Sequence, residues 1–182
     1  MPLLANWIRS GGSAAPPLAY CTIAVALAAA PTRSVAYGKE VWECYAETIS
    51  PEPAQLLLRV SNGTKKGTLF ATKKNGDRLI ISGDLILNDP TNATVLYGQM
   101  FCDAHDDQFV NEVIVVGRLS KEAKVSDTQK SAARSVAVNR YNDGEELTDW
   151  FRLRGYGFSM DKLVGAPKGS LVSAHGCLEQ KA

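Results

Sequence analysis

The sequence is poor in the residues that build most metal and catalytic sites. It has two histidines, His105 and His175, and four cysteines, none of them in a CxxC pair. The histidines are not spaced with the cysteines as zinc ligands are, which argues against a metal site. No nucleophile with an ordered base, phosphate-binding glycine loop or metal-spaced carboxylate pair is present. We therefore expect no enzyme and no cofactor. The cysteines should be small buried thiols, although Cys21 and Cys44 could pair in an oxidising compartment.

The sequence also lacks a charge excess, with 20 basic and 19 acidic residues and a net charge of +1. A polyanionic partner would therefore need a local basic surface. No apolar run suits a membrane span. The best candidate is PPLAYCTIAVALAAAP, within the first 39 residues, which contain no Asp or Glu. This run fits a first β-strand over Cys21–Leu27, which we prefer, or a targeting segment.

The two interpretations of this run differ in what they imply for the N-terminus. With a strand at Cys21–Leu27, residues 1–16 become a flexible tail and the protein is expected in the cytoplasm or nucleoid. With a targeting segment, the expected location is an organelle, either a mitochondrion or a plastid.

The chain does contain a predicted strand with one face that is too polar to be buried in a core. In TDWFRLRGYG, residues 148–157, successive side chains of a β-strand point to opposite sides. One side carries Phe151, Leu153 and two glycines and fits a core. The other side carries Trp150, Arg152, Arg154 and Tyr156. Two guanidinium groups are costly to bury unpaired, so this side predicts an exposed surface for a flat ligand with a charged backbone.

The chain repeats itself with a constant offset. LLRVSNGTKKGTLFATKKNGDRLIISGDL at 57–85 aligns without a gap to WFRLRGYGFSMDKLVGAPKGSLVSAHGCL at 150–178 and pairs Arg59 with Arg152. The few identities fall on core positions and on turn glycines, including Gly76 with Gly169, as in a duplicated domain. Each copy predicts a strand, a helical connector, a glycine turn and a second strand.

Short strands at this spacing predict an all-β protein made of small barrels, and the five-stranded Greek-key OB-fold fits best. A short helix over FSMDKLVGA, with Met160, Leu163 and Val164 as its apolar residues, would cap the barrel. We expect two such domains in tandem, over 17–104 and 105–182. The first copy has five strand candidates and the second has four. The second therefore lacks its last strand, which leaves an edge for another chain or the N-terminal tail to close.

Three segments of the second copy resemble the bacterial and organellar single-stranded DNA-binding protein (SSB) family. They are NEVIVVGRLSKEAKV, SVAVNRYNDGEELTDWFRLRGYG and KGSLVSAHGCLE, and the resemblance covers essentially all of 110–179. AAAPTRSVAYGKEV and NGDRLIISGDL in the first copy are similar more weakly. The resemblance implies sequence-tolerant binding of single-stranded DNA, in replication, repair and recombination, by a homo-oligomer. It leaves RNA open as the ligand.

The resemblance also implies which residues bind the strand. The family's stacking Trp matches Trp150, and its further stacking aromatics match Tyr156 and Tyr141. The basic residue two positions after the Trp matches Arg152. A phosphate backbone could then follow a set of basic residues: Arg118, Lys121, Lys124, Arg134, Arg140, Arg154, Lys162 and Lys168.

The first copy departs from this pattern at three positions, with Leu57 in place of Trp150, Ser61 in place of Arg154 and Gly63 in place of Tyr156. It keeps Arg59 and a basic connector, TKKGTLFATKK, so we expect weak electrostatic attraction from it. An exposed Leu57 would suit a protein contact between the barrels or between chains. Trp42 is expected to be structural.

An alternative function is a protein-interaction or structural subunit of a larger complex, with nucleic-acid binding lost or reduced. The near-zero net charge and the degenerate first copy favour it. Trp150 and Tyr156 would then be interface anchors, since both residue types are enriched at protein–protein hot spots. Arg152 would pair with a nearby acid: Asp149, Glu145 or Glu146.

Overall fold

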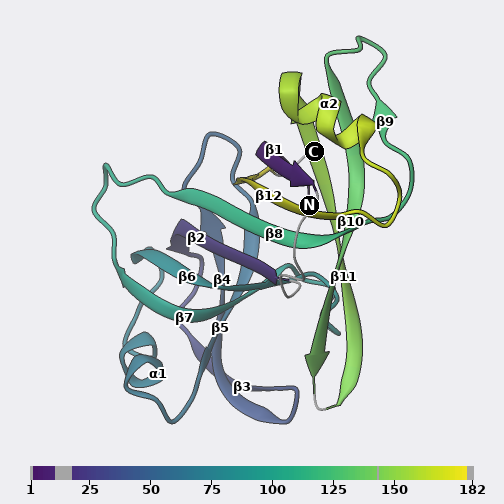
Figure 1. Ribbon diagram of the computed structural model, residues 1–182. Coiled ribbons are helices and arrows are strands. Elements are labelled where there is room, and N and C mark those ends of the chain that lie inside the picture. Colours follow the sequence, from purple (N-terminus) through teal and green to yellow (C-terminus); the bar gives the residue numbers. More distant parts are fainter. Residues whose placement is uncertain (1, 11–17, 143, 180–182) are drawn as a thin grey trace. The chain divides into compact units, whose positions relative to one another are not determined.

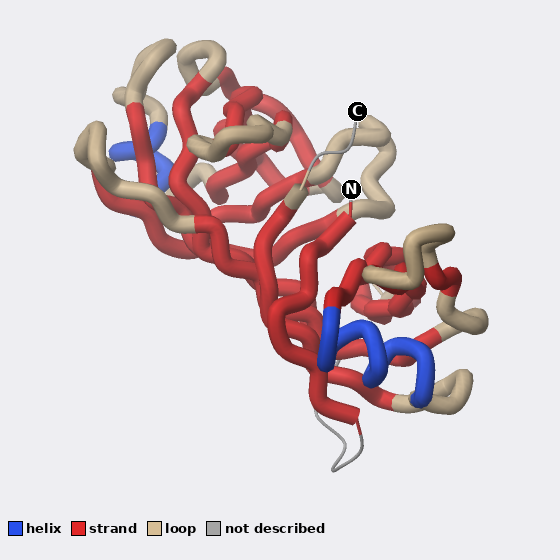
Figure 2. The backbone as a smooth tube through the Cα atoms, turned by 90° about the horizontal axis from the view of Figure 1, so that it is seen from above, coloured by secondary structure: helices blue, strands red, loops and turns tan. Residues whose placement is uncertain are grey.

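The computed structural model describes residues 2–10, 18–142 and 144–179. These residues divide into two compact units, which we call the first and the second barrel. The first barrel is Tyr20–Asn111, and the second consists of the chain from Glu112 onward together with the residues before Tyr20. The division between these units falls at Glu112, and the two domains over 17–104 and 105–182 stay a prediction. Strands dominate the described residues, and both helices are short (Figure 2).

The first barrel is closed by its own continuous stretch of chain. The ring runs β2 (Leu18–Leu27), β4 (Lys39–Thr48), β5 (Gln55–Ser61), β7 (Val95–Asp103), β6 (Arg78–Ile86) and back to β2. The short strand β3 (Thr32–Ala36) adds to β4, and helix α1 (Lys65–Phe70) follows β5. The apolar run that fits a targeting segment or a strand forms β2, with Ile23, Ala24 and Val25 fully buried.

The second barrel is closed by strands from both ends of the chain (Figure 1). Its ring runs β8 (Asn111–Leu119), β10 (Ser131–Asn142), β11 (Glu145–Tyr156), β1 (Pro2–Ser10), β12 (Leu171–Leu178) and back to β8. The two-residue strand β9 (Lys124–Val125) pairs with β10, and helix α2 (Gly157–Gly165) follows β11.

Strand β1 fills the place of the strand that the second copy lacks. It runs parallel to β11 and antiparallel to β12, as β7 runs parallel to β5 and antiparallel to β6 in the first barrel. The N-terminus is therefore a barrel strand over Pro2–Ser10, where the sequence predicts a flexible tail. The strand escapes detection because its register shifts between Ala5 and Trp7, and such a shift interrupts the two-residue period by which strands are recognised.

The repeat reappears in the elements. Strand β6 begins at Arg78 and β12 at Leu171, which keeps the spacing between Arg59 and Arg152. The two turn glycines, Gly76 and Gly169, have φ angles of +87° and +83°, a conformation that strains any residue with a Cβ. Helices α1 and α2 occupy the expected connectors.

Helix α2 packs directly on β11, although fewer of its apolar side chains are buried than the sequence predicts. A Cβ at Gly155 would lie 2.8 Å from the carbonyl carbon of Ser159, so glycine is what allows this contact. Leu163 of this helix is fully buried, whereas Val164 is 49% exposed.

No helix among the described residues has the length and apolar character needed to cross a membrane.

All four cysteines are free thiols. Cys21 and Cys44 are buried, as expected, while Cys102 is exposed and Cys177 is partly buried. Burial, with a smaller contribution from Asp84, raises the pKa of Cys21 to about 12. Burial, with a contribution from Glu43, raises the pKa of Cys44 to about 12 as well. Both thiols are therefore protonated and unreactive at neutral pH.

The closure by β1 leads to a folding prediction. Residues 112–179 alone should not form a stable barrel, because β11 and β12 would each keep an unpaired edge. The same residues followed by a short Gly-Ser linker and residues 2–10 should fold, because the linker restores the missing strand. Dispersed amide NMR signals and a cooperative urea transition would identify the folded chain. Equal folding of the two chains would contradict the role of β1.

Candidate nucleic-acid interface

The outer face of β11 carries the four residues that the strand period predicts. Trp150 is 55% and Tyr156 is 50% exposed, while Phe151 and Leu153 between them are buried. Arg152 is exposed and Arg154 half-buried on the same side. The strand is hydrogen-bonded to β10 on one side and, at its Arg152–Arg154 end, to β1 on the other, so this face is presented by a paired backbone.

Strand β10 leaves this face open because its residues there are small. Directly opposite residues of an antiparallel pair lie on the same side of the sheet. The register places Ala137 opposite Trp150, Ser135 opposite Arg152, Ala133 opposite Arg154 and Ser131 opposite Tyr156. None of these neighbours is large enough to cover an aromatic ring. The ring faces are therefore free to stack with a ligand.

A third aromatic extends the face toward the β10–β11 turn. Tyr141 is 75% exposed and lies opposite Glu146, four residues before Trp150. At about 3.4 Å per residue, Tyr141 and Trp150 are roughly 14 Å apart along the strand, and Trp150 and Tyr156 roughly 20 Å apart. The three aromatics therefore span about 34 Å.

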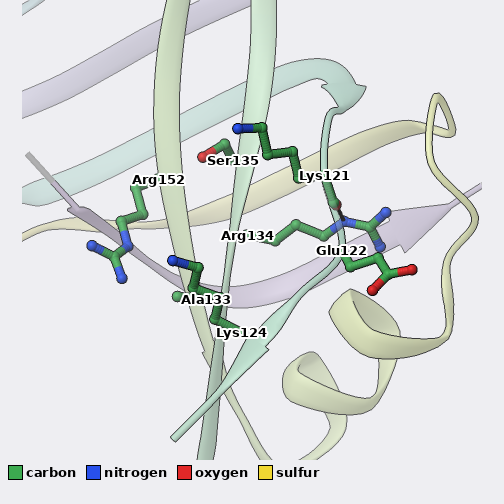
Figure 3. A pocket seen from close by; sticks show the side chains of 7 residues that line it. All are labelled: Lys121, Glu122, Lys124, Ala133, Arg134, Ser135 and Arg152. Carbon is green, nitrogen blue, oxygen red and sulfur yellow. Dashed lines mark hydrogen bonds between the residues drawn. The ribbon is translucent and has the colours of Figure 1, made fainter.

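A basic pocket of about 260 Å³ lies beside β11 at Arg152, two residues after Trp150. Its lining is Lys121, Glu122, Lys124, Ala133, Arg134, Ser135 and Arg152, shown in Figure 3. Four of these residues carry positive charge and one carries negative charge. A single anionic group, such as a phosphate, would find several donors here.

Arg134 occupies a special place in this pocket, because its guanidinium group is turned away from Arg152 toward α2 (Figure 3). It is buried and donates hydrogen bonds to the carbonyls of Lys121 at 2.5 Å, Leu163 at 2.7 Å and Ala166 at 2.6 Å. These partners include the C-terminal end of a helix, which attracts cations. Arg134 thus ties the loop after β8 to α2, and its charge has no carboxylate partner among the described residues.

Further basic residues flank the same face. Arg118 of β8 lies opposite Ala137, which lies opposite Trp150, so the three form one row across the sheet. The Arg118 guanidinium donates to the carbonyl of Gly169 at 3.0 Å, beside the exposed Lys168. A second row joins Lys124, Ala133 and Arg154.

The structure adds Phe158, which sequence reasoning missed. It stands in the first turn of α2, two residues after Tyr156, and is 66% exposed. The Lys162 ammonium lies 5.0 Å from its ring centroid, a cation–π geometry. The sequence could have indicated an exposed Phe158, because this residue lies outside the apolar pattern of Met160, Leu163 and Val164. Phe158 and Lys162 carry the path of exposed aromatics from β11 onto the helix.

The structure does not bring Arg140 together with the other candidate residues. It lies on the opposite face of β10, where its Nε donates to the carboxylate of Asp149 at 2.8 Å. Asp149 is almost fully buried. This pair removes Asp149 from the acids that could neutralise Arg152. No ion pair of Arg152 occurs within the described part of the chain.

The matching face of the first barrel is covered. Every residue from Leu56 to Val60 in β5 is buried, so both sides of this strand are packed. Leu57, which the sequence predicts to be exposed, is only 4% exposed and packs with Ile86 and Val95, next to Ala93 and Tyr97. The expectation fails because residues 87–94, which connect β6 to β7, turn back beside Leu57, whose amide donates to the carbonyl of Thr94 at 2.9 Å.

Arg59, the counterpart of Arg152, is engaged by two acids. Its Nη1 lies 2.6 Å from Asp89, in the covering segment, and its Nε lies 3.1 Å from Glu43, opposite it in β4. The Asp89 carboxylate also accepts hydrogen bonds from Tyr37 and Thr91. Trp42 is structural, as expected, because its indole N–H donates to Asn62 and Arg33 lies over its ring.

The Asp89 network predicts how stability depends on pH. Burial alone would raise the pKa of Asp89, but hydrogen bonds from Arg59, Thr91 and Tyr37 outweigh it and lower the pKa from 3.8 to about 2. The ionised carboxylate therefore stabilises the folded state by about 2 kcal/mol above pH ~4, and this contribution is lost as the pH falls toward ~2.

Urea unfolding of the first barrel, followed by its NMR signals between pH 2 and 6, measures this contribution. The variant Asp89→Asn should be less stable near neutral pH and should lack this part of the pH dependence. Wild type and variant curves that run parallel from pH 2 to 6 would contradict the assignment.

No family model matches the chain, and no curated protein matches it by sequence. Among solved structures, the wild-type single-stranded DNA-binding protein from Thermus aquaticus is similar with a TM-score of 0.65 and 13% identity, over 92% of this chain and 87% of that chain. A deletion variant of the same protein is similar with a TM-score of 0.64 and 12% identity, over 91% and 88%. Similarity at this level of identity shows that this chain shares the all-β barrel fold of these proteins.

Proposed function

We propose that the chain binds single-stranded DNA in a sequence-tolerant way through the outer face of β11, without catalysis. The observation that carries this proposal is the row of Trp150, Arg152, Arg154 and Tyr156, held outward beside the small residues of β10. Exposed aromatics alternating with cations are what a single strand requires, because bases stack and phosphates are charged. The shared fold with single-stranded DNA-binding proteins supports the same ligand.

In this proposal the bases and the phosphates use different residues. Bases stack on Trp150 and Tyr156, with Tyr141 and Phe158 extending the path at its two ends. Phosphates bind in the pocket formed by Lys121, Lys124 and Arg152, and along Arg154, Arg118, Lys168 and Lys162. The span of about 34 Å corresponds to roughly ten nucleotides at a duplex-like rise of 3.4 Å, and to fewer in a stretched strand.

Both barrels fit the OB-fold, and we propose that they form a tandem pair. Each ring has a first strand that pairs with the second and the fourth, a third strand that precedes a helix, and a fifth strand parallel to the third. The second barrel takes its fifth strand from the N-terminus. A strand-binding protein of this kind would serve DNA replication, repair or recombination.

A protein-interaction role is the second candidate, and the covered face of the first barrel favours it there. Arg59 is saturated by acids and Leu57 is buried, so the first barrel offers little to a base. Self-association stays a prediction. The two features that suggested it, an exposed Leu57 and an open barrel edge, are both covered within the chain.

The first binding prediction concerns stacking. Trp150→Ala should weaken binding of an oligothymidine by about 1–3 kcal/mol, or about 5- to 150-fold, because one base loses its platform. Fluorescence-anisotropy titration at fixed salt measures the change. Trp150→Phe should keep part of the affinity, and Phe109→Ala, which truncates an exposed aromatic of the first barrel, should change nothing. Wild-type affinity in Trp150→Ala would refute the stacking face.

The second binding prediction concerns salt. Affinity should fall with a log–log slope of about −0.7 per phosphate contact, and we expect about two to four contacts in wild type. Replacing both Lys121 and Lys124 with Ala should reduce this slope by up to about 1.4 while leaving quenching of tryptophan fluorescence intact. Lys39→Ala, on the β3–β4 hairpin, serves as the control. An unchanged slope in the double variant would exclude the pocket as a phosphate site.

A further inference from the structure

The two barrels carry the same arginine in different surroundings. Arg152 faces Ser135 across the β10–β11 pair and lines an open pocket. Arg59 faces Glu43 across the β4–β5 pair and is 5% exposed beneath Asp89. An arginine thus stands at the repeat position in both copies, with two carboxylate partners in the first barrel and an open pocket in the second.

The Asp89 carboxylate is held as a phosphate would be. Arg59 contacts both of its oxygens, with Nη1 at 2.6 Å and Nη2 at 3.4 Å. Tyr37 donates its hydroxyl at 2.8 Å, and Thr91 donates its amide at 3.0 Å and its hydroxyl at 2.5 Å. A forked guanidinium, hydroxyl groups and a backbone amide are also the donors that proteins direct at phosphate oxygens.

On the basis of the proposed function, we propose that Arg59 marks a masked phosphate-binding site in the first barrel. Residues 87–94 cover the outer face of β5, and the Asp89 carboxylate occupies on Arg59 the position that a nucleic-acid phosphate takes on Arg152. The chain therefore presents one open nucleic-acid face and keeps the second closed with its own carboxylate.

The different closure of the two barrels explains why only one face is masked. The covering segment 87–94 exists because the chain must connect β6 to β7. The strands at these two positions in the second barrel are β12 and β1, which lie at opposite ends of the described chain. No described segment therefore connects them across Arg152, and the outer face of β11 stays open.

Chemical rescue of the full chain tests the masked site. Asp89→Ala removes the carboxylate and leaves room for an anion beside Arg59. We expect the melting temperature of the first barrel to fall by roughly 10–20 °C in sodium chloride, and inorganic phosphate at equal ionic strength to restore part of this loss. Asp106→Ala is the matched control, because it removes the carboxylate partner of another arginine, Arg78, from a position where that carboxylate is almost fully exposed.

The stabilisation of Asp89→Ala by phosphate should depend on Arg59 and not on the outer face of β11. In the double variant Arg59→Leu with Asp89→Ala, the phosphate effect should disappear, whereas adding Trp150→Ala to Asp89→Ala should leave it unchanged. A failure of the proposed DNA-binding function would appear in oligothymidine titrations and would not alter this rescue. The proposal is overturned if phosphate stabilises Asp89→Ala no more than it stabilises wild type, or if the variant stays unfolded in both salts.

Discussion

The second barrel depends on a hydrogen-bonded strand that comes from the other end of the chain. A sheet can close into a barrel only if every strand finds two neighbours, and β11 and β12 would otherwise present unpaired edges. Strand β1 satisfies both, parallel to one and antiparallel to the other. The outer face of β11 depends on this closure at its Arg152–Arg154 end, because a strand paired on both sides holds its outward side chains in fixed directions.

The parts of the structure that follow from local periodicity could be predicted. The alternation in TDWFRLRGYG placed Trp150 and Tyr156 outward and Phe151 inward, and the repeat located the helices and the turn glycines. The parts that depend on distant segments could not. A shift of register concealed β1, and the burial of Leu57 depends on residues about thirty to forty positions away in the chain. Nothing local to Leu57 distinguishes an exposed apolar residue from a covered one.

The partners of the arginines in the candidate site could not be predicted from the sequence either. Arg140, Arg134 and Arg152 are all candidate phosphate ligands in the sequence, but the structure gives them three different surroundings. Arg140 pairs with a buried carboxylate, Arg134 binds carbonyls at a helix end, and Arg152 faces an open pocket. Strand parity distinguishes Arg152 from the other two, since Arg134 and Arg140 point to the inner side of β10. Their partners come from elements that only the folded chain brings together.

The division of the second barrel between the two ends of the chain also fixes an order of assembly during synthesis. Strand β1 is translated before its antiparallel partner β12, and the whole first barrel lies between them in the chain. The first barrel, whose strands are contiguous, can fold as soon as β7 has emerged. The N-terminal strand must wait throughout this time without a partner. The second barrel, and with it the outer face of β11, can therefore close only after β12 has been translated.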